Sequence, residues 1–295
     1  MPLRVGITLG DPAGIGPEII RAALASKRLP AKAEYQIIGR DFAGVAGQPS
    51  PDSARAAAAA LEEAVTLARR GELDAIVTGP VHKAGLYDIG FKFPGQTEFF
   101  AERLGIQNFA MLLTGGSLTV ALVTIHIPLR EVAEALKESE IVRIGRLLQD
   151  FLMLRSHEPP RIAVAGLNPH AGESGKIGRE EIEIIAPAIA QLSEAAGAAA
   201  TFQGPVSSDT VFHRAAVGEF DAVLCMYHDQ GLIPLKLHSF HSGVNVTLGL
   251  PFPRTSPDHG TAFGIAGRGL ARPDSMIAAI HLAVELADAR APRKR

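Results

Sequence analysis

The sequence predicts an α/β protein built from parallel βαβ units. Short aliphatic or β-branched runs alternate with longer helix-like stretches along the chain, which is the pattern of parallel strands joined by helices. Most of the short runs are almost continuously apolar, as expected for strands covered on both faces. The chain has 295 residues, 47% of them hydrophobic, so it can bury a large core in one or two lobes.

Eight segments are predicted to be strands because they are short and rich in aliphatic residues. They are residues 3–9, 35–38, 74–77, 110–113, 118–124, 161–165, 221–226 and 244–248.

The helices between them are predicted from their ends. Pro17 fits the first turn of a helix, and Asp52 or Ser53 can cap an alanine-rich helix that runs to Arg70. Further helices are expected over residues 129–155, 179–196 and 275–289.

Charge and composition exclude several classes of partner. Lys and Arg number 29 against 31 Asp and Glu, for a net charge of -2, so the electrostatic term that non-specific nucleic-acid binding requires is missing. Anionic membrane surfaces are excluded by the same argument, and no apolar run approaches the roughly 20 residues of a membrane span. The single cysteine, Cys225, excludes an intramolecular disulfide, so we expect a cytoplasmic protein.

Two turns follow predicted strands near the N-terminus. In residues 10–18, the spacing Gly-x-x-x-Gly-x-Gly is not a dinucleotide fingerprint. The segment either presents backbone amides to an anion at a helix start or is a plain strand-to-helix turn, and the two interpretations stay open. Lys83, in the second turn, is either a ligand for a phosphate or carboxylate or a solvent-exposed side chain.

The most informative pattern is formed by three histidines. His126, His170 and His228 each follow a predicted strand within a polar turn of its own. Because the carboxyl ends of parallel strands share one edge of a sheet, these imidazoles are expected there together. A histidine in a loop is more often a structural residue, but three such turns favour a catalytic divalent-metal site.

Residues after His228 predict a binding site for a small anion. Lys236, Asn245 and Arg254 offer two cations and an amide. Lys236 is also a candidate to move a proton. The glycine-rich stretch 258–273 suits a nucleotide, because small side chains let the backbone approach a ligand closely.

Long ordered strings of the chain resemble the NAD-dependent 4-hydroxythreonine-4-phosphate dehydrogenase family of pyridoxal phosphate biosynthesis. They are residues 10–18, 78–83, 95–100, 124–129, 166–173, 226–232, 236, 243–255 and 258–262. The resemblance implies oxidation and decarboxylation of 4-phosphooxy-L-threonine to 3-amino-2-oxopropyl phosphate, carbon dioxide and NADH.

The same resemblance implies roles for individual residues. His126, His170 and His228 match the ligands of a divalent metal (zinc, magnesium or cobalt) shared between the subunits of a homodimer. Substrate contacts match Gln96, Thr97, Lys236, Asn245 and Arg254. On chemical grounds, the catalytic candidates are Lys236 as acid/base and Asp229, which either orients a histidine or the lysine or caps a turn. Gln96 departs from the family's Gly-His-Thr-Glu string, which leaves the precise substrate open.

The stretch 259–273 is similar to the adenine-side loop of isopropylmalate and isocitrate dehydrogenases. It implies NAD contacts at His259, Gly260, Thr261, Ala262 and Gly267, with NADP as an open alternative. It also implies a two-lobed fold with an interlobe cleft. We expect one lobe from 1–118 plus 256–295, and a second from 119–255 carrying the metal ligands and the dimer interface.

Two other functions stay open. One is a related dehydrogenase for threonate or erythronate phosphate, or for a dihydrodiol carboxylate. The other is a non-catalytic module that binds a metabolite.

Overall fold

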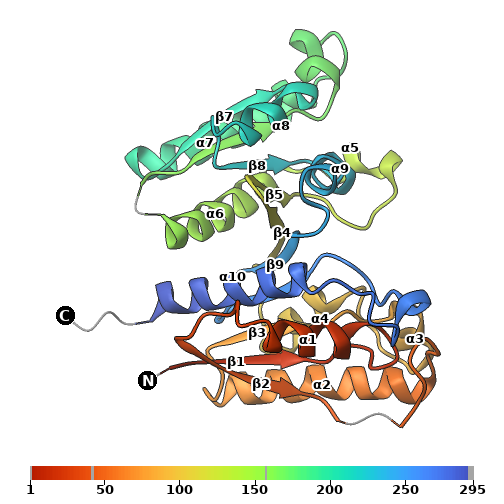
Figure 1. Cartoon of the computed structure of the whole chain (residues 1–295). Helices are drawn as coiled ribbons and strands as arrows, with labels where there is room; N and C mark the ends of the chain where they lie inside the picture. Colours follow the sequence, from red (N-terminus) through yellow and green to blue (C-terminus); the bar gives the residue numbers. More distant parts are fainter. Residues whose placement is uncertain (1, 41–42, 157, 292–295) are drawn as a thin grey trace. The chain divides into compact units, whose positions relative to one another are not determined.

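A computed structural model describes residues 2–40, 43–156 and 158–291 and divides the chain into two compact units (Figure 1). Unit 1 comprises Met1–Gln107 and Val244–Arg295, and unit 2 comprises Asn108–Gly243. Both boundaries fall earlier in the chain than the expected 118 and 255. The reason is strand pairing: Ala110–Gly115 forms an antiparallel pair with Leu118–Leu122 in unit 2, and Val244–Leu248 pairs with Arg254–Pro257 in unit 1.

Unit 1 is a five-stranded sheet covered by helices on both faces. Its strand order is β2 (Ala33–Ile38), β1 (Leu3–Thr8), β3 (Ala75–Thr78), β10 (Arg254–Pro257) and β9 (Val244–Leu248), all parallel except β9. The helices are α1 (Gly16–Ala25), α2 (Pro51–Arg69), α3 (Lys83–Asp88), α4 (Gln96–Leu104), the 3₁₀ turn η5 (Phe263–Ile265) and α10 (Asp274–Arg290). Helices α1 and α10 cover one face, and α2 covers the other with α3 and α4 (Figure 1).

Unit 2 repeats this architecture with a different order of elements. Its sheet runs β4 (Ala110–Gly115), β5 (Leu118–Leu122), β8 (Ala222–Cys225), β6 (Arg161–Ala165) and β7 (Thr201–Val206), parallel except for β4. The longer helices are α6 (Glu138–Arg155), α7 (Ala186–Ala196), α8 (Ser208–Ala216) and α9 (His228–Ser239). Shorter pieces are η1 (Leu129–Glu131), α5 (Val132–Ala135), η2 (Pro169–Gly175), the π-helical turn η3 (Glu181–Ile185) and η4 (Gly197–Ala199).

The predicted α/β class and the mostly parallel pairing are confirmed, while local details differ. Helix α2 is capped by Ser50, whose side chain accepts from the Ser53 amide, so neither Asp52 nor Ser53 is the cap. Ser53 instead reciprocates as the third helical residue, and Pro51 occupies the first turn. The expected helix over 129–155 is interrupted at Leu136, which has an extended conformation, so it forms three separate pieces.

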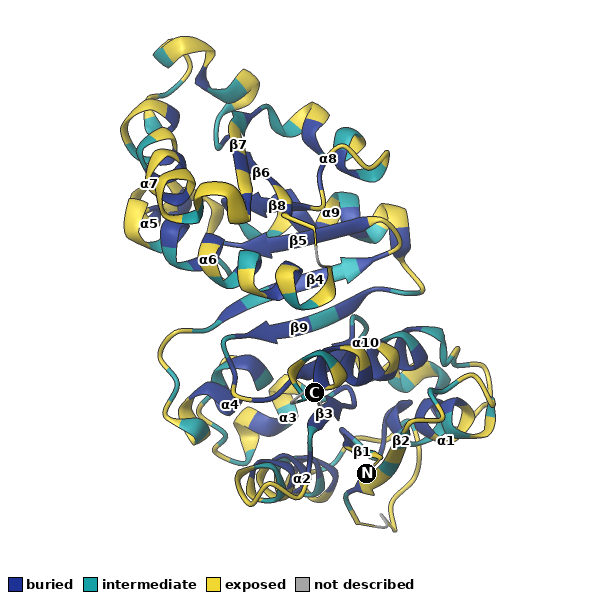
Figure 2. Ribbon diagram, turned by 90° about the vertical axis from the view of Figure 1, so that its left-hand side faces the viewer, coloured by how far each residue is buried: buried dark blue, intermediate teal, exposed yellow. Residues whose placement is uncertain are grey.

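Burial differs between the middle and the edges of the sheets. The strands in the middle are mostly buried, whereas the edge strands β2 and β7 carry exposed residues, and the longer helices turn exposed residues outward (Figure 2). Unit 2 has an aliphatic core built from β5, β6, β8 and α9, and unit 1 has a core with the phenylalanines of α4. No helix of the described residues is long and apolar enough to span a membrane.

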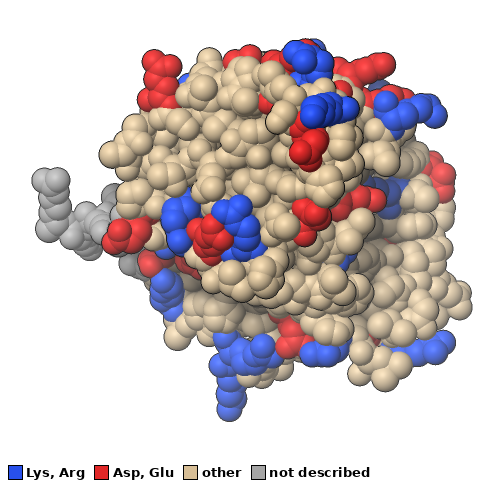
Figure 3. Space-filling model, turned by 90° about the horizontal axis from the view of Figure 1, so that it is seen from above, with Lys and Arg blue, Asp and Glu red and all other residues tan. Residues whose placement is uncertain are grey.

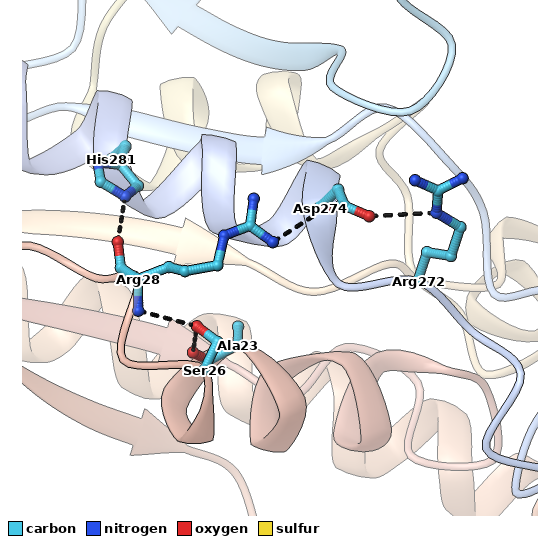
Figure 4. A network of polar contacts seen from close by, with 6 residues as sticks. All are labelled: Ala23, Ser26, Arg28, Arg272, Asp274 and His281. Carbon is cyan, nitrogen blue, oxygen red and sulfur yellow. Dashed lines mark hydrogen bonds and ion pairs between the residues drawn. The ribbon is translucent and has the colours of Figure 1, made fainter.

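Polar contacts on the surface of unit 1 link the chain after α1 to α10. Arg28 pairs with Asp274 at 3.0 Å, and Arg272 pairs with the same carboxylate at 3.2 Å (Figure 4). His281 of α10 bonds the Arg28 carbonyl at 2.6 Å. Together these contacts tie the chain after α1 to the start and middle of α10.

On the face shown in Figure 3, acidic and basic side chains are interspersed, and no single-sign patch covers it.

Candidate functional site

The three histidines of unit 2 follow three neighbouring parallel strands. His126 comes after β5, His228 after β8 and His170 after β6, and β8 pairs in parallel with both of the others. The expected common edge is therefore present. His126 and His170 both adopt positive φ angles, 28° and 52°. Such backbone conformations are costly for a non-glycine residue and cluster at functional sites.

Two of the histidines meet at one cavity. The rings of His126 and His228 lie 5.6 Å apart between centroids, and both line a cavity of about 210 Å³ with Thr124 and Tyr227. Asp229 lies 2.7 Å from His228 Nδ1. A carboxylate that accepts from Nδ1 leaves Nε2 as a lone-pair donor, which is the arrangement typical of metal-binding histidines.

The third histidine lies on a differently shaped loop. Residues His170–Ser174 have left-handed backbone angles, and Glu181 holds the approach to this loop by accepting from the Leu167 and Asn168 amides at 2.7 and 2.6 Å. Over the described residues, no three His, Cys, Asp or Glu side chains lie close enough to hold a metal ion. The chain by itself thus brings together His126 and His228 but not the full predicted triad.

Lys236 lies on the same helix as His228. Both belong to α9, and eight residues at 1.5 Å per residue separate them by about 12 Å along the axis. Lys236 is half-buried. The backbone of Lys236 therefore lies more than two helical turns along α9 from that of His228.

The predicted anion-binding site in unit 1 is centred on Arg254, which is only 2% exposed. Its Nη2 donates to Thr78 Oγ1 and to Gln96 Oε1, the latter at 3.0 Å, and its Nη1 donates to Thr247 Oγ1 at 3.3 Å. Burial lowers the pKa of Arg254 to about 10, and the nearby Glu98 carboxylate acts in the opposite direction. The guanidinium is thus a buried cation held by uncharged side chains.

Two polar atoms beside this cation lack a partner. Arg254 Nε and Asn245 Oδ1 are both buried without a hydrogen bond. Asn245 and Thr247 alternate with Val246 along β9, and the antiparallel register places Thr247 opposite Arg254 and Asn245 opposite Ser256. Asn245 and Arg254 therefore share one face of the sheet. An unmatched donor and acceptor on one face suit a ligand with both an anionic group and a hydroxyl or amine.

Gln96 and Thr97 lie at the start of α4, and their side chains form hydrogen bonds within the protein. Gln96 Nε2 donates to the Gly79 carbonyl at 3.2 Å, while its Oε1 accepts a hydrogen bond from Arg254 Nη2. The Thr97 hydroxyl pairs with that of Thr247 at 3.2 Å. Both predicted contacts thus belong to the network that supports Arg254.

The predicted cofactor loop is held at several points. The Thr261 carbonyl accepts from the Ile15 amide at 2.9 Å, and the Gly267 amide donates to Glu18 Oε2 at 2.9 Å. Ala262 and Gly267 have positive φ angles of 43° and 74°. Gly260 is exposed, with no atom within 4 Å of where a Cβ would lie, so space does not require glycine there.

Polar atoms without partners also adjoin this loop. His259 Nδ1 contacts the Gly260 carbonyl, but its Nε2 is buried and unpaired, as are Glu18 Oε1 and His82 Nδ1. His82 stacks edge-to-face on Phe263 at 5.2 Å. Such a loop offers a polar ligand both backbone access and unsatisfied side-chain groups.

The first glycine-rich turn favours the scaffold interpretation. The amides of Asp11, Ala13, Gly14 and Ile15 all bond to protein oxygens, so they are not available to an anion. A Cβ at Gly14 would lie 2.8 Å from the Thr261 carbonyl oxygen, so this turn packs directly on the predicted cofactor loop.

Several site residues escaped the sequence analysis. Thr78 and Thr247 hold Arg254, Glu18 holds Gly267, and Glu181 holds the loop of His170. Threonines within strands and carboxylates within helices are too common to mark a site. Among these residues, only Glu18 could have been noticed in the sequence, because it follows Pro17 in the first turn of a predicted helix.

Comparisons with known proteins agree over almost the whole chain. The model of the family described as "Pyridoxal phosphate biosynthetic protein PdxA" matches residues 18–283. A 4-hydroxythreonine-4-phosphate dehydrogenase from Caulobacter vibrioides is 43% identical, with 97% of this chain and 98% of that protein covered.

Solved structures show the same relationship. The crystal structure of 4-hydroxythreonine-4-phosphate dehydrogenase from Klebsiella pneumoniae matches with a TM-score of 0.80 at 38% identity, covering 97% of this chain and 99% of that one. A terephthalate 1,2-cis-dihydrodiol dehydrogenase from Burkholderia xenovorans matches with a TM-score of 0.68 at 28% identity, covering 97% and 98%. Isocitrate dehydrogenase from Methylococcus capsulatus shares the fold, at 18% identity and a TM-score of 0.55, covering 97% and 87%.

Proposed function

The chain belongs to the PdxA family of pyridoxal phosphate biosynthetic proteins, and we propose that it oxidises and decarboxylates 4-phosphooxy-L-threonine with NAD and a divalent metal. It is an oxidoreductase, and its dehydrogenase relatives imply a nicotinamide cofactor. The products would be 3-amino-2-oxopropyl phosphate, carbon dioxide and NADH.

The observation that carries the proposal is the buried Arg254. Its guanidinium is held by neutral side chains, and its Nε has no partner. A buried cation in this state is completed by an anionic substrate group, because a charge-assisted hydrogen bond compensates the cost of desolvation. Asn245 Oδ1 would accept from a substrate hydroxyl or amine on the same face of the sheet.

The histidine pair fits a metal on its donor chemistry. Two imidazoles lie at one cavity, and Asp229 bonds His228 Nδ1, so Nε2 of His228 suits zinc or cobalt better than magnesium, which prefers oxygen ligands. A bound divalent ion would supply Lewis acidity to the hydroxyl that is oxidised.

Completion of this site requires a second subunit in our proposal. His170 does not join the histidine pair of its own chain, and Lys236 lies more than two turns along α9 from His228, so in our proposal a partner subunit supplies both. The outer face of α9 supports a homodimer, because Ile233, Leu237 and Phe240 are 65%, 89% and 73% exposed at helical spacing. Its apolar side chains suit burial against a second copy.

Lys236 is the group that we propose to take the proton. Oxidation removes a hydride from the carbinol carbon to the nicotinamide and a proton from its hydroxyl to the Lys236 amine. As the bond to the carboxylate carbon of the β-keto acid breaks, its electron pair passes to the neighbouring carbonyl as an enolate, and carbon dioxide leaves. The Lys236 ammonium then returns its proton to the enolate carbon, which gives the product ketone. The loop containing His259, Gly260, Thr261, Ala262 and Gly267 would hold the adenosine end of the cofactor, with NAD the expected form.

The direct test is substrate-dependent formation of NADH. We expect turnover with 4-phosphooxy-L-threonine and NAD, less with NADP, and none after exhaustive chelation. Equal activity after chelation would refute the metal assignment. Formation of no NADH with any hydroxy acid, although ligands bind, would indicate a non-catalytic binding module.

A second candidate is a related dehydrogenase for threonate or erythronate phosphate or a dihydrodiol carboxylate. It is favoured by the 28% identical terephthalate dihydrodiol dehydrogenase and by Gln96, where the family string has histidine. A panel of phosphorylated and unphosphorylated substrates separates the two, because only the first candidate predicts the highest kcat/KM for 4-phosphooxy-L-threonine.

Shared use of the site is tested by mixing inactive variants. His170→Ala and His228→Ala homodimers are both expected to be inactive. If the two histidines of one site come from different subunits, hybrid dimers contain one intact site and regain up to about half of the activity per dimer. If both come from one subunit, a hybrid has one intact site only when the two changes lie in the same chain, and mixing restores nothing.

A further inference from the structure

The side-chain amide of Gln96 both donates and accepts a hydrogen bond inside the protein. Its Nε2 donates to the Gly79 carbonyl at 3.2 Å, and its Oε1 accepts from Arg254 Nη2 at 3.0 Å. Gln96 begins helix α4, directly after Gly95. The residue therefore connects the turn after β3 to the guanidinium of β10.

Arg254 is oriented by acceptors on one side only. Thr78 and Gln96 both hold Nη2, and Thr247 holds Nη1, whereas Nε has no partner. Strand register explains the convergence: Arg254 lies opposite both Ile76 and Thr247, and Thr78, two residues beyond Ile76, faces the same side of the sheet. The guanidinium is thereby fixed with Nε left for a ligand.

All of these acceptors are uncharged. Charged groups around the network are Glu98, which acts on Arg254 through its field, and Lys83, whose Nζ lies 3.7 Å from where a Cβ of Gly95 would be. No carboxylate among the described residues forms an ion pair with Arg254. The positive charge thus stays available to an anion.

We propose that Gln96 is a positioning residue, which fixes Arg254 through a neutral hydrogen bond so that the guanidinium keeps its charge and its Nε for the anionic group of the substrate. This inference rests on the proposed function and assigns Gln96 a role through Arg254, by the hydrogen bond from Arg254 Nη2 to Gln96 Oε1.

The proposal requires two properties of residue 96: it must accept a hydrogen bond, and it must be neutral. Gln96→Ala removes the acceptor. Gln96→Glu keeps an acceptor but adds a negative charge that would pair with Arg254. Gln96→His can accept only while its imidazole is neutral, because both ring nitrogens of the imidazolium are donors.

The experiment measures the dissociation constant of inorganic phosphate by calorimetry and KM for 4-phosphooxy-L-threonine, at pH 6.0 and 8.5. We expect both constants to rise about 5–10-fold in Gln96→Ala and at least 10-fold in Gln96→Glu, with a smaller change in kcat. Gln96→His should resemble the unmodified protein at pH 8.5 and Gln96→Ala at pH 6.0.

Ratios of variant to unmodified protein at each pH remove the titration of phosphate itself. Gln36→Ala, an exposed glutamine on β2 of the same unit, is the matched control and should change neither constant. Circular dichroism checks folding; if Gln96→Ala fails to fold, Gln96→His carries the test, since its two pH values are compared in one folded protein.

The outcomes separate this inference from the proposed function. Unchanged constants in Gln96→Glu, or a Gln96→His variant without the pH-dependent loss, would overturn the positioning role. If phosphate binding follows the expected pattern but no substrate yields NADH, the positioning role holds and the proposed function fails. If phosphate binding is too weak to measure, the KM ratios decide.

Discussion

The two units join the amino ends of their strands by the same kind of ion pair, but their candidate sites differ. In unit 1, Arg4 donates to Asp74 through its amide at 2.8 Å and its Nη2 at 3.1 Å. In unit 2, Arg161 donates to Asp221 through the same groups at 2.7 and 2.9 Å. Each pair clamps two parallel strands, β1 to β3 and β6 to β8.

The candidate sites of the two units differ in how complete they are within one chain. Unit 1 surrounds one buried cation with a nearly complete network inside a single chain. Unit 2 places three histidines directly after parallel strands, two of them with positive φ, and brings only two of them together. In our proposal, one fold plan therefore supports a preformed anion site in one unit and a site that needs further ligands in the other.

The largest effect is expected from the incomplete site of unit 2. His228→Ala removes a proposed metal ligand, so kcat/KM should fall by at least about 10³-fold, because a bound metal contributes several kcal/mol to transition-state stabilisation. Metal content measured by elemental analysis should fall with it. His213→Ala, an exposed histidine of α8 in the same unit, is the control and should retain both metal and rate.

Arg254→Met tests the preformed site of unit 1. We expect kcat/KM to fall about 10²- to 10³-fold, since removing a buried hydrogen-bonded charge costs roughly 2–5 kcal/mol of binding. The free energy of unfolding should not decrease, because the lost hydrogen bonds are offset by removal of a buried cation without an ion-pair partner.

The measurements for Arg254→Met are initial rates and urea denaturation. A loss of more than about 2 kcal/mol of stability would mean that Arg254 serves the fold rather than the ligand.

Asp229→Asn should have an intermediate effect. Asp229 lies 2.7 Å from His228 Nδ1, and loss of such an orienting carboxylate weakens metal affinity about 10–100-fold. Competition with a chromophoric chelator measures that affinity. At saturating metal the rate should largely recover, whereas the rate of His228→Ala should not; identical behaviour of the two variants would contradict an orienting role.

The smallest effects are expected at the amino-end clamps. Partial burial acts to raise the pKa of Asp74 and of Asp221, but hydrogen bonds and charge from Arg4 and Arg161 outweigh it, so both pKa values lie below the usual value. Each clamp therefore contributes stability above about pH 4 that disappears as pH falls through the folded pKa.

Because both pairs are largely solvent-exposed, Asp74→Asn and Asp221→Asn should each lose only about 0.5–1 kcal/mol at pH 7. Denaturant unfolding at pH 7 and pH 3 measures the difference, which should be similar for the two variants and should shrink at the lower pH. A loss in one variant alone would show that the clamps are not equivalent.

Most of the fold was predictable from local sequence. All eight expected strands are present, since buried parallel strands are continuously apolar. Two further strands escaped detection: β7 contains Gly204-Pro205, which is typical of turns, and β10 has the polar sequence Arg-Thr-Ser-Pro. Their place in the sheets depends on neighbouring strands and not on their own propensity.

The sequence by itself determined the α/β class, the three histidines after parallel strands and the cations of the candidate site. These follow from periodicity and from the single direction of parallel strands, which are local properties. Only the tertiary structure decided that Gln96 supports Arg254, that Glu18 holds Gly267 and that His170 lies apart from His126 and His228. Such contacts join residues far apart in the chain, so they depend on how side chains are oriented once the strands and helices have packed.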